Sequence, residues 1–278
     1  MGGMDDTELR DLVGDSGHVR VHVDDGIAVV AFDRPDKHNA ISFEMWSALA
    51  RIFPALDADP AVDVVLVTGS PGGPFSAGAD IAEFRTLRSD AAGAARYGEA
   101  VEAGERAIIA CSKPTVAAIE GFAIGGGTQV AVACDLRVCG DGSRFGVTPA
   151  RLGIVYGLPS TERLVETVGA AWARYILLTG DLLDADAALR IGLVHEVVAD
   201  DQVANRGLAL ARSVAARARV SLVGGKAMVD RVVHGLLEED DEVRAIYEAS
   251  WSSAEYAEGV AAFLDKRTPD FRAARRPV

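Results

Sequence analysis

The stretch GFAIGGGTQVAVACD, residues 121–135, places three consecutive glycines before an apolar run that is interrupted by the amide of Gln129. The preceding segment, PTVAAIEG at 114–121, predicts a buried strand, whereas 126–134 predicts a helix. The glycines therefore form the turn from a strand into a helix. Free N–H groups at a helix start favour negative charge, and glycine lets a ligand approach the backbone closely.

A second turn of this kind lies in GSPGGPFSAGADIAEF, residues 69–84, which follows a strand predicted at 63–69 and leads into a helix start at Asp80. Neither turn contains the G-x-x-x-x-G-K-[ST] or G-x-G-x-x-G pattern of a phosphate or dinucleotide site. Simple turns with close helix packing are one interpretation. The other is that each turn directs an N–H group at one shared oxygen, where each donor stabilises an oxyanion by roughly 3–4 kcal/mol.

The composition describes an acidic globular chain. Its 278 residues are 49% hydrophobic and carry a formal net charge of −13, so we expect no nucleic-acid partner, which would require a basic face. The three cysteines form no C-x-x-C pair and the histidines lack metal-ligand spacing, so we expect free thiols and no metal. The N-terminus lacks an apolar signal core and no apolar run approaches about 18 residues, so we expect a cytoplasmic protein without membrane association.

Strand and helix patterns alternate along the first part of the chain. A hairpin is predicted at 18–32, and a helix at 42–59 with Ser42 as its N-cap. Further elements are a long helix at 89–112 and strands at 134–140 and 143–147; from Leu158 onward the pattern is almost entirely helical, with segments that include 158–168 and 170–178. We therefore predict an α/β protein with a polar extension at 1–16, an α/β core at 17–200 and a helical C-terminal subdomain at 201–278.

Six segments together resemble the successive motifs of the crotonase, or enoyl-CoA hydratase/isomerase, superfamily. They occur in the expected order and at the expected spacings, between about residues 18 and 271. They are RPDKHNAIS (34–42), FSAGADI (75–81), IEGFAIGGG (119–127), CDLRV (134–138), GLVHEVV (192–198) and EGVAAFLDKRTPDF (258–271).

The resemblance implies a spiral of ββα repeats, a helical trimerisation region, and a homo-oligomer that is a trimer or a dimer of trimers. It implies an acyl-CoA thioester as substrate, with no cofactor besides the coenzyme A that the substrate carries. In this family the N–H groups at the positions of Ala79 and Gly126 form the oxyanion hole for the thioester oxygen.

Other positions are expected at the substrate by the same resemblance. Lys37 and His38 match a loop that meets the CoA nucleotide. Phe263 and Lys266 match a helix that meets the adenine end, sometimes that of a neighbouring subunit, although Lys37 and Lys266 could equally be solvated surface lysines. The remaining residues expected beside the substrate are Ala77, Asp80, Ile81, Gly125, Gln129 and Pro149.

The chain departs from the hydratase pattern at both catalytic carboxylates. Hydratases carry one glutamate two residues after the glycine triplet and another just after the FG of the next strand, where this chain has Gln129 and Pro149. Neither residue can act as a general base, a role worth roughly 10²–10⁴ in rate. A hydratase or isomerase would therefore need displaced acid–base residues. Alternatively, Gln129 bonds a neighbouring helix without touching substrate.

The segment TPARLGIVY, residues 148–156, resembles the methylmalonyl-CoA decarboxylases of the superfamily, which have Thr and Tyr at the spacing of Thr148 and Tyr156. Decarboxylation needs no base, and a glutamate would repel the departing carboxylate. We therefore favour decarboxylation of a malonyl-type acyl-CoA, with Thr148 and Tyr156 orienting the carboxylate. Thr148 as a turn residue, Tyr156 as a core aromatic, and a non-catalytic acyl-CoA-binding protein are the alternatives.

Overall fold

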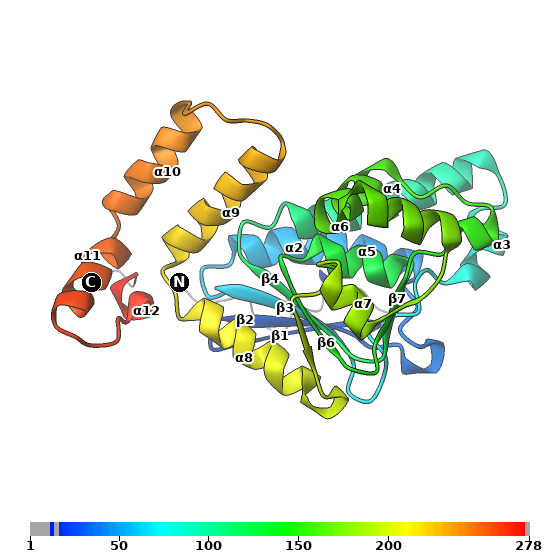
Figure 1. Ribbon diagram of the computed structural model, residues 1–278, viewed down its shortest axis with the longest axis horizontal. Helices are drawn as coiled ribbons and strands as arrows, with labels where there is room; N and C mark the ends of the chain where they lie inside the picture. The colour runs from blue at the N-terminus through cyan, green and yellow to red at the C-terminus, as the bar shows by residue number, and fades with distance from the viewer. Residues whose placement is uncertain (1–11, 14–16, 276–278) are drawn as a thin grey trace.

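The computed structural model describes residues 12–13 and 17–275, and its centre is a six-stranded sheet in the order β1-β2-β3-β4-β6-β9 (Figure 1). The hairpin strands β1 and β2 pair antiparallel and every later neighbour in the sheet is parallel, as expected for apolar strands separated by helices. The strands are β1 (Val19–Asp24), β2 (Ile27–Phe32), β3 (Val64–Gly69), β4 (Thr115–Ile119), β6 (Leu136–Gly140) and β9 (Glu196–Val198).

A second, three-stranded sheet has the order β5-β7-β8. Its strands are β5 (Phe122–Ile124), β7 (Arg144–Gly146) and β8 (Leu183–Asp184). Because β4 and β5 belong to different sheets but are separated by two residues, the chain winds as the predicted spiral of ββα repeats, and the glycine triplet directly follows β5.

Helices cover both faces of the large sheet. On one face α2 (Phe43–Ala58) packs against α4 (Ala91–Ile109) and buries Trp46, Leu49 and Phe53; on the other, α8 (Val203–Ala215) packs on β3, β4 and β6. The remaining elements of this part are η1 (Pro35–Lys37), η2 (Ile81–Glu83), α3 (Phe84–Leu87), α5 (Gly126–Ala133), η3 (Pro149–Leu152), α6 (Leu158–Thr179), α7 (Ala185–Arg190) and η4 (Asp200–Gln202).

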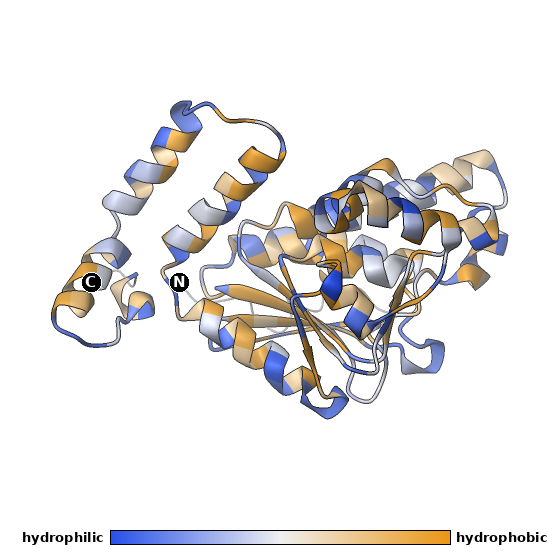
Figure 2. Cartoon of the chain, in the orientation of Figure 1, coloured by the Kyte–Doolittle hydropathy of each residue, from blue (hydrophilic) through white to orange (hydrophobic). Residues whose placement is uncertain are grey.

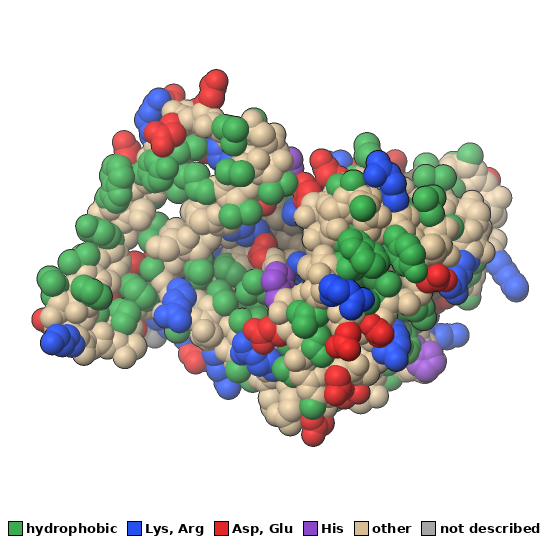
Figure 3. Space-filling view, in the orientation of Figure 1, with side chains coloured by type: hydrophobic (Ala, Val, Ile, Leu, Met, Phe, Trp, Pro, Cys, Tyr) green, Lys and Arg blue, Asp and Glu red, His purple; other side chains and the backbone are tan. Residues whose placement is uncertain are grey.

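The last four helices form an arm that extends away from the sheet (Figure 1). They are α9 (Arg219–Val233), α10 (Asp241–Trp251), α11 (Ala254–Leu264) and α12 (Phe271–Ala274). Asp63 anchors the base of the arm by accepting hydrogen bonds from Arg219 at 2.9 Å and Arg272 at 3.1 Å. Apolar segments alternate with polar ones along these helices (Figure 2), and hydrophobic side chains gather on their surface (Figure 3).

Most predicted elements are confirmed. Ser42 caps α2, because its Oγ accepts the N–H of Met45 at 3.2 Å, and the break expected between 168 and 170 is Gly169, which has φ 75° inside α6. The helical prediction beyond Leu158 missed β8 and β9, which have two and three residues and are too short to show an alternating pattern. The extension at 1–16 lies almost entirely outside the described residues. In the described part of the chain, every helix is too short or too polar to cross a membrane.

Candidate functional site

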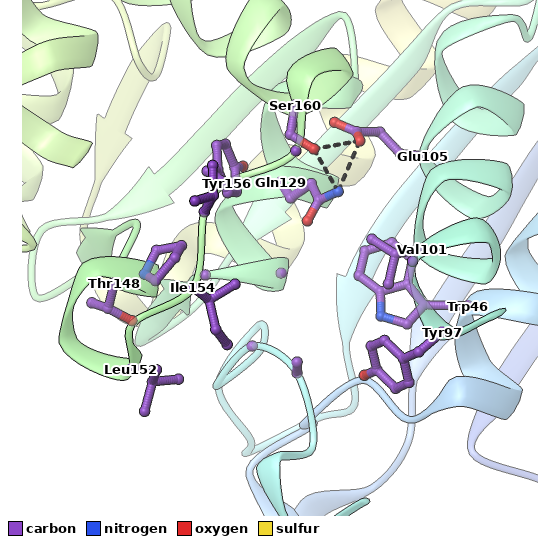
Figure 4. Close-up of a pocket in the computed structure, with 18 of the residues that line it drawn as sticks. Trp46, Tyr97, Val101, Glu105, Gln129, Thr148, Leu152, Ile154, Tyr156 and Ser160 are labelled. Atoms are coloured by element: carbon purple, nitrogen blue, oxygen red, sulfur yellow. Dashed lines mark hydrogen bonds between the residues drawn. The ribbon is translucent and has the colours of Figure 1, made fainter. Parts of the chain in front are cut away.

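A cavity of about 500 Å³ opens beside the two glycine turns, between α2, α4, the start of α5 and the segment 148–160 (Figure 4). Its lining is largely apolar, with a few polar groups that converge on it. Nine of the residues that the sequence placed at the substrate line this cavity: Ala77, Ala79, Ile81, Gly125, Gly126, Gln129, Thr148, Pro149 and Tyr156.

The backbone nitrogens of Ala79 and Gly126 are neighbours in the cavity wall. A Cβ atom placed on Gly126 would lie 3.4 Å from the nitrogen of Ala79. Gly126 is the first residue of α5, so its N–H has no partner inside the helix. Within the described parts of the chain, neither of these two N–H groups donates a hydrogen bond to another protein atom. The geometry therefore presents two adjacent free donors at a helix start, which is the arrangement of an oxyanion hole.

The two turns that carry these donors are bonded to each other. Ile124 donates its N–H to the carbonyl of Ser76 at 3.0 Å, and the Oγ of Ser76 donates to the carbonyl of Asn39 at 2.8 Å and accepts the N–H of Gly78 at 3.1 Å. Gly78 has φ 98°, and a Cβ on it would lie 2.6 Å from the carbonyl oxygen of Ile124. Only glycine fits this position, so the spacing between the two donors is set by the fold.

Gln129 joins three helices at the inner end of the cavity. Its Nε2 donates to Oε2 of Glu105 on α4 and to Oγ of Ser160 on α6, both at 2.8 Å, and Ser160 donates to the same Glu105 oxygen at 2.7 Å (Figure 4). The structure therefore gives Gln129 the bond to a neighbouring helix that the sequence left as an alternative. Its amide oxygen points toward the cavity (Figure 4), so Gln129 offers a hydrogen-bond acceptor there.

Glu105 is a cavity residue that the sequence reasoning missed. It is 1% exposed and lines the cavity beside Gln129. Burial raises the pKa of its carboxyl group, an effect that the hydrogen bonds from Ser160 and Gln129 oppose. The available signal was the position of this glutamate in α4, four residues after Val101 and three before Ile108, on the apolar face of the helix.

Tyr156 lines the cavity, and its hydroxyl group has no hydrogen-bond partner among the described residues. The hydroxyl oxygen is buried, with Glu105 and Ser160 as its polar neighbours; burial and the Glu105 charge raise its pKa. The predicted contact of Tyr156 with the substrate carboxylate stays a prediction, in which the hydroxyl group would meet the carboxylate from beside Glu105 and Ser160. Thr148 precedes η3 without a capping side-chain bond, and Pro149 is the first residue of η3; both line the cavity.

Five expected substrate residues lie outside the described cavity lining. Lys37 and His38 are exposed on a loop whose His38 carbonyl accepts the N–H of Ala77 at 3.0 Å, which places this loop at the cavity rim. Asp80 instead caps η2 and pairs with Arg34 at 2.7 Å. Although burial alone would raise the pKa of Asp80, bonds from Arg34 and the Ala82 N–H lower it, so this carboxylate is occupied within the protein.

Phe263 and Lys266 lie at the far end of the molecule from the cavity. Phe263 is 83% exposed on α11, and Lys266 follows that helix on the arm (Figure 1). Any contact between these two residues and a substrate would therefore involve the cavity of another copy of the chain. Their substrate role stays a prediction.

One group of possible metal ligands occurs among the described residues, outside the cavity lining. Ligand-type atoms of Glu162, Glu166 and His234 lie within 4.8 Å of one another. Glu166 also pairs with Arg163 at 3.1 Å. Because surface acidic groups commonly lie this close without an ion, we assign no metal to them.

Comparison with known proteins gives one consistent family. The enoyl-CoA hydratase/isomerase family model matches residues 22–274. The chain is 34% identical over 250 residues to the protein of Mycobacterium leprae named "Probable enoyl-CoA hydratase echA8", covering 88% of this chain and 94% of that one. It is 32% identical over 249 residues to a crotonyl-CoA hydratase of Syntrophomonas wolfei, with the same coverage of 88% and 94%.

Solved structures agree with the sequence comparisons. The crystal structure of an enoyl-CoA hydratase/isomerase family protein from Hyphomonas neptunium superimposes with a TM-score of 0.88 at 34% identity, covering 91% of this chain and 97% of that chain. A structure of an enoyl-CoA hydratase/carnithine racemase from Magnetospirillum magneticum also gives 0.88, at 33% identity, over 92% and 96% of the two chains. Taken with the two free N–H groups beside the cavity, these matches identify the chain as an enzyme of the enoyl-CoA hydratase/isomerase family.

Proposed function

We propose that the protein binds an acyl-CoA thioester in this cavity and stabilises the thioester enolate between the N–H groups of Ala79 and Gly126. The proposal rests on these two adjacent N–H groups in the cavity wall, which donate no hydrogen bond to any other described part of the protein. Such donors act most strongly in a site with little water, and this cavity is largely apolar.

The reaction that the site supports best is decarboxylation of a malonyl-type acyl-CoA. The bond between the α-carbon and its carboxylate breaks, CO2 leaves, and the electron pair passes into the thioester as an enolate whose oxygen accepts both N–H groups. A proton from water then adds to the α-carbon. Gln129 and Pro149 support this reaction, because neither can take up a proton and neither repels a carboxylate.

Hydration of an enoyl-CoA is a second candidate, and Glu105 favours it. This buried carboxyl group lines the cavity 2.8 Å from the amide nitrogen of Gln129, so the cavity retains a titratable group that is displaced from both hydratase positions. The names of the relatives also favour it. To catalyse hydration, Glu105 would have to activate water while its carboxyl group is bonded to the amide of Gln129. Hydration is therefore the weaker of the two candidate reactions.

Separate incubations with methylmalonyl-CoA, ethylmalonyl-CoA and crotonyl-CoA, followed by mass spectrometry, distinguish these reactions. We expect CO2 loss from the malonyl thioesters and little hydration of crotonyl-CoA. Rapid hydration of crotonyl-CoA without CO2 loss would instead establish the second candidate. Binding of acyl-CoAs without any turnover would identify a non-catalytic binding protein.

Two variants at one position test the oxyanion hole. Gly126→Pro deletes the N–H group at the first position of a helix, where proline fits, and we expect a loss of roughly 10²–10³ in kcat. Gly126→Ala keeps the N–H group and serves as the matched control, with a smaller loss from the contact of its Cβ with Trp46 at 3.1 Å. Equal activity of the Pro variant and the wild type would contradict the proposal.

We also propose that the arm assembles the chain into a trimer or a dimer of trimers. Large apolar side chains on the arm are strongly exposed, among them Trp251 at 65%, Phe263 at 83% and Leu264 at 73%. Monomeric proteins rarely expose contiguous apolar patches of this kind. The distance of Phe263 and Lys266 from their own cavity supports a CoA site that is completed by a second copy.

A further inference from the structure

Three buried hydrogen-bond donors of the described cavity lining lack partners: the Tyr156 hydroxyl, which lies beside Glu105 and Ser160, and two donors that share another wall. Trp46 on α2 is 1% exposed and Tyr97 on α4 is 3% exposed, and both line the cavity. Within the described parts of the chain, no atom bonds Nε1 of Trp46 or the hydroxyl of Tyr97. Both polar atoms point into the cavity from the same wall (Figure 4). Buried polar groups are nearly always paired, so an unpaired couple aimed at one cavity indicates a ligand.

The chemistry of these two atoms specifies the ligand group. The indole Nε1–H is a donor only, and a tyrosine hydroxyl that faces no protein acceptor is free to donate. The ligand must therefore supply acceptor oxygen atoms to this wall. An unsubstituted alkyl or alkenyl acyl chain would leave both donors unpaired.

The donors lie beside the proposed oxyanion hole. A Cβ atom on Gly126 would be 3.1 Å from Cζ2 of Trp46, and Cζ2 is bonded to the ring carbon that carries Nε1. The Trp46 N–H group therefore lies close to the place where a thioester oxygen would bind at the Gly126 N–H group.

A positive charge completes this wall. The guanidinium of Arg88 lies 4.4 Å from the ring centroid of Phe84 and 5.7 Å from that of Tyr97, and Arg88 lines the cavity. In the described part of the chain Arg88 forms no ion pair. It is therefore a half-buried cation whose neighbours are aromatic faces.

The acidic groups near this wall are already engaged. Glu83 accepts the N–H of Phe43 at 2.8 Å, and Asp80 pairs with Arg34 at 2.7 Å. Glu102 pairs with Arg106. Glu105 holds the amide of Gln129 on a different part of the lining (Figure 4). Arg88 thus remains available to an anionic ligand.

We propose that the Trp46 N–H and the Tyr97 O–H, with Arg88 beside them, form a subsite for a carboxylate on the α-carbon of the acyl group. The subsite rests on the proposed acyl-CoA function and assigns its substrate class: acyl-CoA thioesters with an α-carboxylate. It gives the carboxylate a position at the wall of α2 and α4, in place of the one predicted at Thr148 and Tyr156. Trp46 and Tyr97 contact the carboxylate through neutral donors, which fix its direction without the strong ground-state binding of a direct ion pair.

Binding of a matched ligand pair tests the subsite. Methylmalonyl-CoA and isobutyryl-CoA share a carbon skeleton and differ at one position. Methylmalonyl-CoA has a carboxylate there, and isobutyryl-CoA has a methyl group. Calorimetric titration of both into the Gly126→Pro protein, whose kcat should be roughly 10²–10³ lower, measures binding with little turnover. We expect methylmalonyl-CoA to bind at least about tenfold more tightly, since hydrogen bonds to charged groups are among the strongest.

Variants that each remove one donor, in the same background, locate that preference. Tyr97→Phe removes one oxygen, and we expect it to weaken methylmalonyl-CoA binding roughly tenfold while isobutyryl-CoA binding changes less than about twofold. Trp46→Phe should also weaken methylmalonyl-CoA binding more than isobutyryl-CoA binding, although it removes part of a buried ring together with the donor. Tyr175→Phe, on an exposed tyrosine of α6 outside the cavity lining, is the matched control.

The outcomes separate the subsite from the proposed function. If both ligands bind and Tyr97→Phe weakens them equally or not at all, the subsite is wrong and acyl-CoA binding stands. If acetoacetyl-CoA, with a neutral oxygen, binds more tightly than methylmalonyl-CoA, the carboxylate assignment is wrong. If no acyl-CoA binds the wild-type protein, the proposed function itself fails.

Discussion

The amide nitrogen of Gln129 lies 2.8 Å from Oε2 of Glu105, so the residue that replaces the hydratase glutamate is held by a carboxyl group from another helix. Ser160 completes the cluster by donating to the same oxygen at 2.7 Å. These contacts fix which end of the amide faces the cavity, because the nitrogen is committed to Glu105 and Ser160. The substitution therefore belongs to a built polar cluster and is not an isolated loss of a catalytic group.

Gln129→Glu should destabilise the protein. The new carboxyl group would lie against Glu105, and two buried carboxylates cannot both ionise without a large penalty. We expect the free energy of unfolding at pH 7 to fall by about 1–3 kcal/mol, measured by urea denaturation. The loss should become smaller as the pH falls, because protonation of one of the two groups removes the repulsion. If Gln129→Glu is as stable as the wild type or more stable at pH 7, residue 129 does not lie against the Glu105 carboxyl group as described.

Glu105 should make stability depend on pH. Its pKa is raised above the ordinary value of 4.5 by burial, so the folded state favours the protonated form more than the unfolded chain does. Stability should therefore fall as pH rises above about 4.5 and level off above the folded-state pKa. Urea denaturation of the wild type and Glu105→Gln between pH 4 and 8 isolates this contribution as the difference between the two profiles. Parallel stability profiles of the two proteins across this pH range would contradict a raised pKa of Glu105 in the folded state.

Gly78→Ala should disable the oxyanion hole. The φ of 98° is unfavourable for alanine, and the added Cβ would lie 2.6 Å from the carbonyl oxygen of Ile124. We expect the turn to move and the rate with acyl-CoA substrates to fall at least about tenfold, as misplacement of a donor predicts. Gly225→Ala on α9, where a Cβ meets no atom within 4 Å, is the control and should keep full activity.

The arm should be required for assembly. Sedimentation velocity of the wild type should give a trimer or a dimer of trimers, and Phe263→Asp, which places a charge on an 83% exposed apolar position, should reduce the assembled fraction. If Lys266 contacts CoA across subunits, Lys266→Ala should raise KM for acyl-CoA and leave sedimentation unchanged. A monomeric wild-type protein would remove the basis for both expectations.

The sequence predicted the parts of the site that depend on local geometry. The turns at 69–84 and 121–135 contain their own glycines, which predicts free donors at two helix starts, and the family resemblance then implied Ala79 and Gly126 as those donors. The polar cluster and the unpaired donors could not be predicted in this way. Glu105 and Ser160 are 55 residues apart, and Trp46 and Tyr97 come from different helices, so only packing brings them to one cavity.

The same distinction applies to the fold. The hairpin, α2 and the break at Gly169 have local signals in turn residues, a cap and a glycine. The strands β8 and β9 exist only because β7 and β6 offer them hydrogen-bond partners. Nothing within their own two or three residues distinguishes them from the helical pattern around them.

The bond between Ser76 and Ile124 means that the oxyanion hole has no local folding nucleus of its own. Its two donors acquire their spacing only when segments more than 40 residues apart have closed onto each other, with Asn39 held at the same point. A partly unfolded chain would lose both donors together, since neither turn is fixed without the other. Loss of activity in denaturant should therefore coincide with global unfolding, and an acyl-CoA ligand should stabilise the whole fold by mass action.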